Sequence, residues 1–260
     1  MRRIFIELLF LLAIGGLVWA AFAYFIHFPK QPRLISTEKE IELGEKYADV
    51  ILSLNGFEKI NNQRVDSFLL VTADSLHKAQ LNPTYSYTLM IVDNSMVNAF
   101  ALPGGQIIIT KGLIEFCESS EELIAVISHE VAHIEKRHVI TRLIKDIGLE
   151  ILTTGDAYVV GEVARTIISS GYNRKQEVEA DLFACELMLN CNLEPRSLAP
   201  LFRRLKEDKG DYPFEQFEIV ASHPNMDNRI KTILAFEVPN NFEPISPWFT
   251  IEELKEIVSE

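Results

Sequence analysis

Apolar and polar residues recur at helical spacing over most of the chain. Boxes of a hydroxyl residue followed three positions later by glutamate predict helix starts at Thr37, Ser119 and Thr250. The first of these helices should run toward Leu52, and another is expected at 62–80. Helices should dominate from the second box onward, since apolar residues there keep the helical spacing.

Strands are predicted only in the first half of the chain. Residues 84–92 alternate between polar and apolar, and the β-branched run 106–110 follows the turn residues Pro103-Gly104-Gly105. The expected fold class is therefore α+β, mainly helical with a small β-sheet. No internal repeat is evident, so about 230 residues after the N-terminal segment fit one domain.

Residues 4–26 form an almost uninterrupted apolar segment, long enough to span a bilayer. Arg2 and Arg3 precede it and favour a cytoplasmic N-terminus, which places the remainder outside the cytoplasm. A cleaved signal peptide is the alternative, because Ala21-Phe22-Ala23 resembles a cleavage site, although apolar residues continue to Phe28. The predicted organisation is a membrane anchor or signal peptide at 1–28, a linker at 29–36 and one domain at 37–260.

Charge and cysteine content narrow the classes of function. The formal net charge is −12, with 37 acidic and 25 basic residues, which argues against nucleic-acid binding. Cys185 and Cys191 are close enough in sequence to form a disulfide if the helix around them ends early. Separate buried thiols are the expected arrangement.

The main chemical signal is His129-Glu130-Val131-Ala132-His133, within a stretch predicted to be helical. Residues four apart share a helix face, so both imidazoles can reach one zinc ion while Glu130 points at a zinc-bound water. The alternative is a core helix that happens to carry these side chains. It fits poorly, because buried ionisable groups need partners or a metal.

A third metal ligand is expected further along the chain. The metzincin pattern would need glycine and histidine where this chain has Lys136 and Val139. His138 would lie on a different face of a continuing helix and is predicted to be solvated rather than a ligand. Glu177 and Asp181 are four apart, so Glu177 can bind zinc while Asp181 accepts a hydrogen bond from the far nitrogen of a ligand imidazole.

The alternative for this acidic segment is a solvated helix start. Glu179, between the two acidic residues, should point elsewhere.

Four ordered elements resemble the membrane-linked gluzincin family of zinc metallopeptidases that includes HtpX, BepA, Oma and the Ste-type CAAX prenyl proteases. The resemblance covers roughly residues 37–235. The elements are HEVAH (129–133), E-x-E-A-D (177–181), NAFALPGG (98–105) before QIIIT (106–110), and Ser222-His223-Pro224 followed by Arg229.

The resemblance implies a zincin-type domain with one zinc per chain, bound by His129, His133 and Glu177. It implies that Glu130 is the catalytic base and that His223 and Arg229 lie across the cleft. It also implies that an edge strand flanks the active-site helix and binds an extended substrate backbone, with substrate-binding residues Asn98, Ala99, Phe100 and Ala101. The alternative for this strand is an ordinary internal hairpin.

The implied chemistry is coherent. Three protein ligands leave one zinc position for water, whose pKa falls toward about 7, and Glu130 can take its proton and later deliver it to the leaving amine. His223 and Arg229 are candidates to stabilise the oxyanion, although an ordinary loop histidine is the alternative for His223. In a latent form His223 could instead occupy the fourth zinc position.

The predicted function is a membrane-anchored zinc metalloendopeptidase with its catalytic domain in the bacterial periplasm or envelope. By resemblance, its substrates are misfolded or unassembled membrane and envelope proteins. If the signal peptide is cleaved, the protein is secreted to the periplasm. A prenyl-protein protease is disfavoured because it would need several spans, and a zinc-stabilised chaperone or assembly factor stays as the non-enzyme alternative. The sequence does not indicate an oligomeric state.

Overall fold

The computed structural model describes residues 34–54, 56–149, 152, 157–169, 171–207, 223 and 225–259, together with Gly15, Gly16 and Trp19. The chain divides into two units, Met1–Ser36 and Thr37–Glu260, and the architecture below is that of the second. Apart from those three positions, the apolar segment 4–26 lies outside the described residues, so the membrane anchor stays a prediction. No described helix is both long and apolar enough to cross a bilayer.

Helices form most of the second unit, as the hydrophobic spacing predicts. Ser119 Oγ accepts a hydrogen bond from the Glu122 amide (3.3 Å), and Thr250 and Glu253 cap each other's amides. In chain order the helices are α2 (Thr37–Leu52), α3 (Gln63–Lys78), α4 (Lys111–Phe116), α5 (Ser120–Glu135), α6 (His138–Ile147), α8 (Ala157–Ser169), α9 (Arg174–Asn190), α10 (Leu198–Glu207), α12 (Met226–Leu234) and α13 (Ile251–Ser259).

Three strands form one mixed sheet in the order β1-β3-β2. Strand β3 (Gln106–Thr110) is central, pairing in parallel with β1 (Thr88–Val92) and antiparallel with β2 (Ala99–Ala101). The expected α+β class is confirmed, and so is the strand at 106–110. β2 is an edge strand within the described sheet.

The strand predicted at 84–92 is shorter than expected. The amides of Thr84 and Tyr85 donate to the Glu135 carboxylate at the end of α5, at 3.0 to 3.3 Å. Because these amides are bonded to a side chain, they cannot extend the sheet ladder, and β1 begins only at Thr88.

A tight turn connects β2 to β3 through the 3-10 segment η1 (Pro103–Gly105). Gly104 has a φ of 73° in the left-handed region, where a side chain is strained. Helix α2 packs closely on this turn, since a Cβ on Gly44 would lie 1.8 Å from the Pro103 carbonyl oxygen. The packing of α2 therefore fixes the turn that sets the position of the edge strand.

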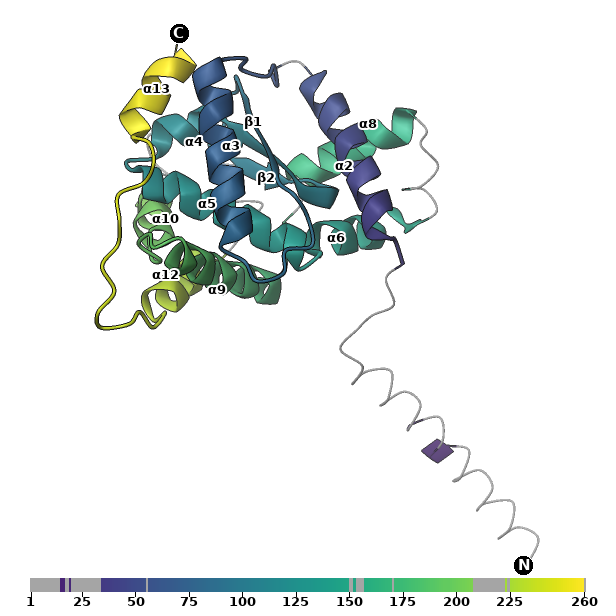
Figure 1. The fold of residues 1–260 in the computed structure, drawn as a ribbon. Coiled ribbons are helices and arrows are strands. Elements are labelled where there is room, and N and C mark those ends of the chain that lie inside the picture. The colour runs from purple at the N-terminus through teal and green to yellow at the C-terminus, as the bar shows by residue number, and fades with distance from the viewer. Residues whose placement is uncertain are drawn as a thin grey trace, which may run out of the picture. The chain divides into compact units, whose positions relative to one another are not determined.

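Helix α5 is the centre of the unit. It packs against β2 and β3 on one side and against α9 and α10 on another, as Figure 1 shows for the helices gathered beside it. Every residue from Glu122 to Ile134 is buried. Because this helix has almost no solvated face, its ionisable side chains must find partners inside the protein.

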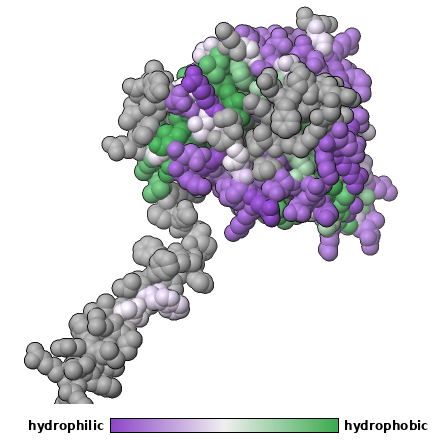
Figure 2. Space-filling view, turned by 180° about the vertical axis from the view of Figure 1, so that it is seen from behind, coloured by the Kyte–Doolittle hydropathy of each residue, from purple (hydrophilic) through white to green (hydrophobic). Residues whose placement is uncertain are grey.

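The surface differs sharply from this interior. Figure 2 shows one face that is mostly hydrophilic, with smaller hydrophobic patches among its described residues. This agrees with an acidic excess that is largely solvated. The cysteines are free thiols, with Cys117 and Cys185 buried and Cys191 half-buried, so separate thiols are confirmed over a Cys185–Cys191 disulfide.

Candidate metal centre and active site

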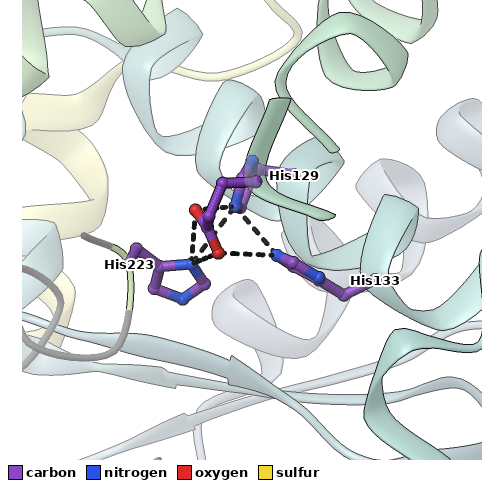
Figure 3. A group of neighbouring side chains, drawn as sticks. His129, His133 and His223 are labelled. Atoms are coloured by element: carbon purple, nitrogen blue, oxygen red, sulfur yellow. Dashed lines mark hydrogen bonds and ion pairs between the residues drawn. The ribbon is translucent and has the colours of Figure 1, made fainter. Parts of the chain in front are cut away.

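Helix α5 presents His129 and His133 one turn apart, with both rings turned toward the same point. Their Nε2 atoms are 3.0 Å apart, and His223 approaches from a separate segment (Figure 3). All three imidazoles are buried. His129 and His133 therefore share one helix face, as predicted.

Helix α9 brings Glu177 to the same point. Its carboxylate oxygens lie 3.6 Å from Nε2 of His129 and 3.6 Å from Nε2 of His133. His223 Nδ1 is 3.0 Å from Glu177 Oε1 and 3.3 Å from His129 Nε2. One donor atom from each of these four side chains lies within 4.8 Å of all the others.

These separations fit a metal ion. Donor atoms placed tetrahedrally around one zinc at 2.0 to 2.2 Å would be roughly 3.3 to 3.6 Å apart. The separations of 3.0 to 3.6 Å given above bracket that range, and the donors are imidazole nitrogens and a carboxylate oxygen, which zinc accepts. The four residues that could hold such an ion are His129, His133, Glu177 and His223.

The charge states of His133 and Glu177 suit metal binding, whereas His129 holds a proton that a bound metal would have to displace. Burial lowers the pKa of His133, which keeps that imidazole neutral with a lone pair available. Burial raises the pKa of Glu177, but His223 and Arg229 lower it more, so the net pKa is below the usual value and the group is ionised. Burial and Arg229 lower the pKa of His129, yet hydrogen bonds to Asp181 and Glu177 raise it to about 9.

A buried ion-pair network lies behind His129. Asp181 Oδ1 is 3.1 Å from His129 Nδ1, the arrangement predicted from the spacing of Glu177 and Asp181. Arg229 donates to both Asp181 oxygens at 2.6 and 2.8 Å and lies 2.8 Å from Glu177. Its guanidinium also stacks over the ring of Phe202 at 4.3 Å. In this conformation Arg229 is engaged with carboxylates, so its predicted contact with an oxyanion stays a prediction.

Glu130 points from α5 toward the edge strand. Its Oε2 accepts a hydrogen bond from the Ala101 amide at 2.9 Å, and its Oε1 lies 3.6 Å from His223 Nε2. Burial raises the pKa of this carboxyl, despite the opposing effect of His223 and His129. A carboxylate with a raised pKa is better matched to proton transfer at neutral pH.

The prediction of a solvated His138 is wrong, because the structure buries this side chain at 6% exposure. Helix α5 ends at Glu135, and Arg137 adopts a left-handed conformation (φ 56°) before α6 begins. The chain therefore turns back, and His138 Nδ1 lies 3.0 Å from His133 Nδ1. His138 does not belong to the four-residue donor cluster, as predicted.

Two further neighbours of the cluster carry no motif in the sequence. The ring of Tyr172 stacks on His133, with centroids 3.7 Å apart and planes at 14°. The guanidinium of Arg142 from α6 lies over the Tyr172 ring, 4.3 Å from its centroid. Tyr172 immediately precedes Asn173, the N-cap of α9. In the sequence, only its position shortly before the E-x-E-A-D element (177–181) could have suggested that it lies near the site.

The segment 98–101 lies beside α5 but is fully buried. Asn98 and Ala101 are each 1% exposed, and the Ala101 amide is occupied by Glu130. Two cavities touch Glu130 and His223, each of only about 10 Å³. A larger cavity of about 520 Å³ lies between α3 and α13, and is lined by none of the cluster residues. Among the described residues, the two cavities that touch Glu130 and His223 are therefore too small for a peptide in this conformation.

An α+β fold in which an H-E-x-x-H helix and a second helix form a buried His-His-Glu cluster has the features of a metallopeptidase. The chain belongs to a defined family of that class: the family model described as "Peptidase family M48" matches residues 59–237, more than half of the chain. The family resemblance inferred from the motifs is confirmed, and the chain carries a domain of a metallopeptidase family.

Individual relatives agree with this assignment. The mitochondrial metalloendopeptidase OMA1 of Arabidopsis thaliana is 29% identical over 153 residues, covering 57% of this chain and 31% of the relative. The beta-barrel assembly-enhancing protease of Escherichia coli (strain K12) is 24% identical over 220 residues, covering 75% of this chain and 43% of the relative. The chain thus spans less than half the length of each of these relatives.

Proposed function

We propose that the protein is a zinc-dependent metalloendopeptidase in which His129, His133 and Glu177 hold one zinc per chain. The observation that carries the proposal is the convergence of two Nε2 atoms and an ionised carboxylate in a buried site beside Glu130. Two imidazoles and one carboxylate leave a coordination position for the reaction, as catalytic zinc sites require.

The side chains around this site have separable roles in peptide hydrolysis. When bound, the zinc would lower the pKa of a water molecule and polarise the substrate carbonyl. Glu130 removes the proton from the attacking water and passes it to the leaving amine. Asp181 accepts a hydrogen bond from the Nδ1–H of His129, which leaves the lone pair of Nε2 for the metal. Arg229 balances the negative charges of Asp181 and Glu177.

We infer that the described conformation is a latent form in which His223 provides a fourth donor. Its Nδ1 lies among the other three donors, where it would compete with water. In an open form His223 would leave this position and donate to the oxyanion, with Arg229 assisting. Movement of His223 is thus expected to couple access to the site with completion of the catalytic residues.

Substrates are proposed to bind as extended peptides along the segment Asn98, Ala99, Phe100 and Ala101. The support is that β2 is an edge strand next to α5, and an edge strand can pair with a peptide backbone. The Ala101 amide now bonds to Glu130, so opening must release it before it can bind substrate.

The proposed setting is the bacterial cell envelope, with residues 1–28 as the anchor or signal peptide, 29–36 as linker and 37–260 as the peptidase domain. The apolar segment 4–26 supports membrane attachment, with secretion to the periplasm after cleavage as the alternative. Misfolded or unassembled membrane and envelope proteins are the proposed substrates. The name of the Escherichia coli relative, a beta-barrel assembly-enhancing protease, supports this choice.

The test is cleavage of unfolded casein by the purified full chain, with and without a metal chelator. Chelation should abolish cleavage and added zinc should restore it, and Glu130→Gln should bind stoichiometric zinc without cleaving. Glu121→Gln, on the same helix but outside the cluster, is the matched control and should remain active. An active Glu130→Gln variant contradicts the proposed base. Suppression of casein aggregation equally by wild type and Glu130→Gln, without cleavage by either, would favour the chaperone alternative.

A further inference from the structure

The break between α5 and α6 places a second histidine against a proposed metal ligand. Lys136 and Arg137 follow the end of α5, and the left-handed Arg137 turns the chain so that His138 opens the next helix facing His133. Arg137 also forms an ion pair with Glu40 of α2, which anchors the turn. The position of His138 is therefore set by backbone geometry and a distant helix, not by chance rotation of a surface side chain.

The contacts of His138 are directional. Its Nδ1 lies 3.0 Å from His133 Nδ1, and its Nε2 lies 3.5 Å from Glu179 Oε2 on α9. Glu179 is half exposed and also lies 3.8 Å from Lys136 Nζ. His133, His138 and Glu179 therefore form a chain of contacts from the metal cluster to the protein surface.

Only one placement of the protons on the two neutral imidazoles gives each contact in this chain a donor and an acceptor. His133 must keep the lone pair of Nε2 for the metal, so its proton belongs on Nδ1, which can then donate to His138 Nδ1. His138 must in turn carry its proton on Nε2, where it faces the Glu179 carboxylate. Each neutral imidazole then has one donor and one acceptor in use.

We propose that His138, supported by Glu179, is a positioning residue that holds His133 in the tautomer competent to bind metal. The inference rests on the proposed role of His133 as a ligand. Without His138, the buried Nδ1–H of His133 loses its acceptor, and the tautomer with the proton on Nε2, which cannot bind metal, becomes more favourable.

The decisive experiment measures the zinc dissociation constant of the full chain by competition with a chelating dye. His138→Phe keeps a ring but has no acceptor, and should weaken zinc binding about 10- to 100-fold. His138→Gln supplies a carbonyl acceptor and should recover most of the affinity. His77→Phe, a histidine on α3 outside the cluster, is the matched control and should bind zinc like wild type.

Three further measurements separate the possible failures. Unchanged secondary structure and thermal midpoint of metal-free His138→Phe would exclude simple misfolding as the cause. The nitrogen NMR shifts of zinc-loaded wild type should show His138 protonated on Nε2 and not on Nδ1, which needs no variant. His133→Ala should abolish zinc binding. If His133→Ala still binds zinc, the assignment of His133 as a ligand is wrong. If His133→Ala loses zinc binding but His138→Phe binds zinc like wild type, only the proposed role of His138 is wrong.

Discussion

His129 and His133 are one helical turn apart on α5 and point at the same centre, yet their surroundings are opposite in character. His129 is backed by charges: Asp181 lies at its Nδ1, and Arg229 holds that carboxylate with two hydrogen bonds. His133 is backed by rings: His138 lies at its Nδ1, and Tyr172 stacks on its face.

The difference shows that two equivalent ligands can be oriented at very different electrostatic cost. On the His129 side, three buried ionic groups, Arg229, Asp181 and Glu177, depend on one another, because an isolated buried charge is strongly unfavourable. On the His133 side, the neutral contacts are individually weaker but leave no net charge behind when one is lost. We therefore expect the charged side to dominate stability, while the supports on both sides affect metal affinity.

The largest expected effect is on the charged side. Arg229→Met should lower the free energy of unfolding of the metal-free protein by about 3–5 kcal/mol, because two buried carboxylates lose their cation. Urea denaturation of the full chain measures this change. Arg165→Met, at an exposed ion pair with Glu162 on α8, is the control and should change stability by about 0.5 kcal/mol or less. Equal losses in the two variants would contradict the comparison.

The next effect concerns His223, the fourth member of the cluster, which belongs to neither the charged side nor the ring side. His223→Ala should lower kcat about 100-fold by removing a donor to the oxyanion, and should lower KM because the latent fourth donor is gone. Steady-state cleavage of a fluorogenic peptide separates these constants. His77→Ala should change neither constant. Unchanged kcat would refute the oxyanion role, and unchanged KM would refute the latent role.

The smallest effect compares the two supports directly. Asp181→Asn should weaken zinc binding about 10-fold or more, because the group at His129 Nδ1 loses its charge, while His138→Gln should stay closer to wild type. Zinc competition titrations of both variants give the ratio. Asp74→Asn, in an exposed ion pair on α3, serves as the control. Equal affinity losses in Asp181→Asn and His138→Gln would show that charge does not distinguish the two sides.

The charged side was largely predictable from the sequence, and the ring side was not. His129, His133, Glu177 and Asp181 follow from fixed spacings within two regular helices, so a four-residue step already places each side chain. His138 was misplaced because that step assumes an unbroken helix, and the left-handed Arg137 interrupts it. Such a turn at a non-glycine residue depends on tertiary contacts, here including Glu40 of α2.

The same limit applies to the fold. Helix starts and the strand at 106–110 were predicted because capping residues and β-branched runs act locally. The start of β1 was not, because the carboxylate of Glu135, about fifty residues later, accepts hydrogen bonds from the Thr84 and Tyr85 amides that would have begun the strand earlier. Tyr172 carries no motif of its own, since its stacking on His133 is a property of the packed protein.

The described residues leave little free volume around Glu130 and His223, and this has a consequence for inhibition. If this conformation is the proposed closed form, a small chelating compound must bind the fraction of molecules that is open, and its apparent affinity is reduced by that fraction. At high concentration the rate of onset should stop rising and equal the rate at which the protein opens. Such compounds would act as slow-onset inhibitors, and the plateau rate would report how often the active site opens in solution.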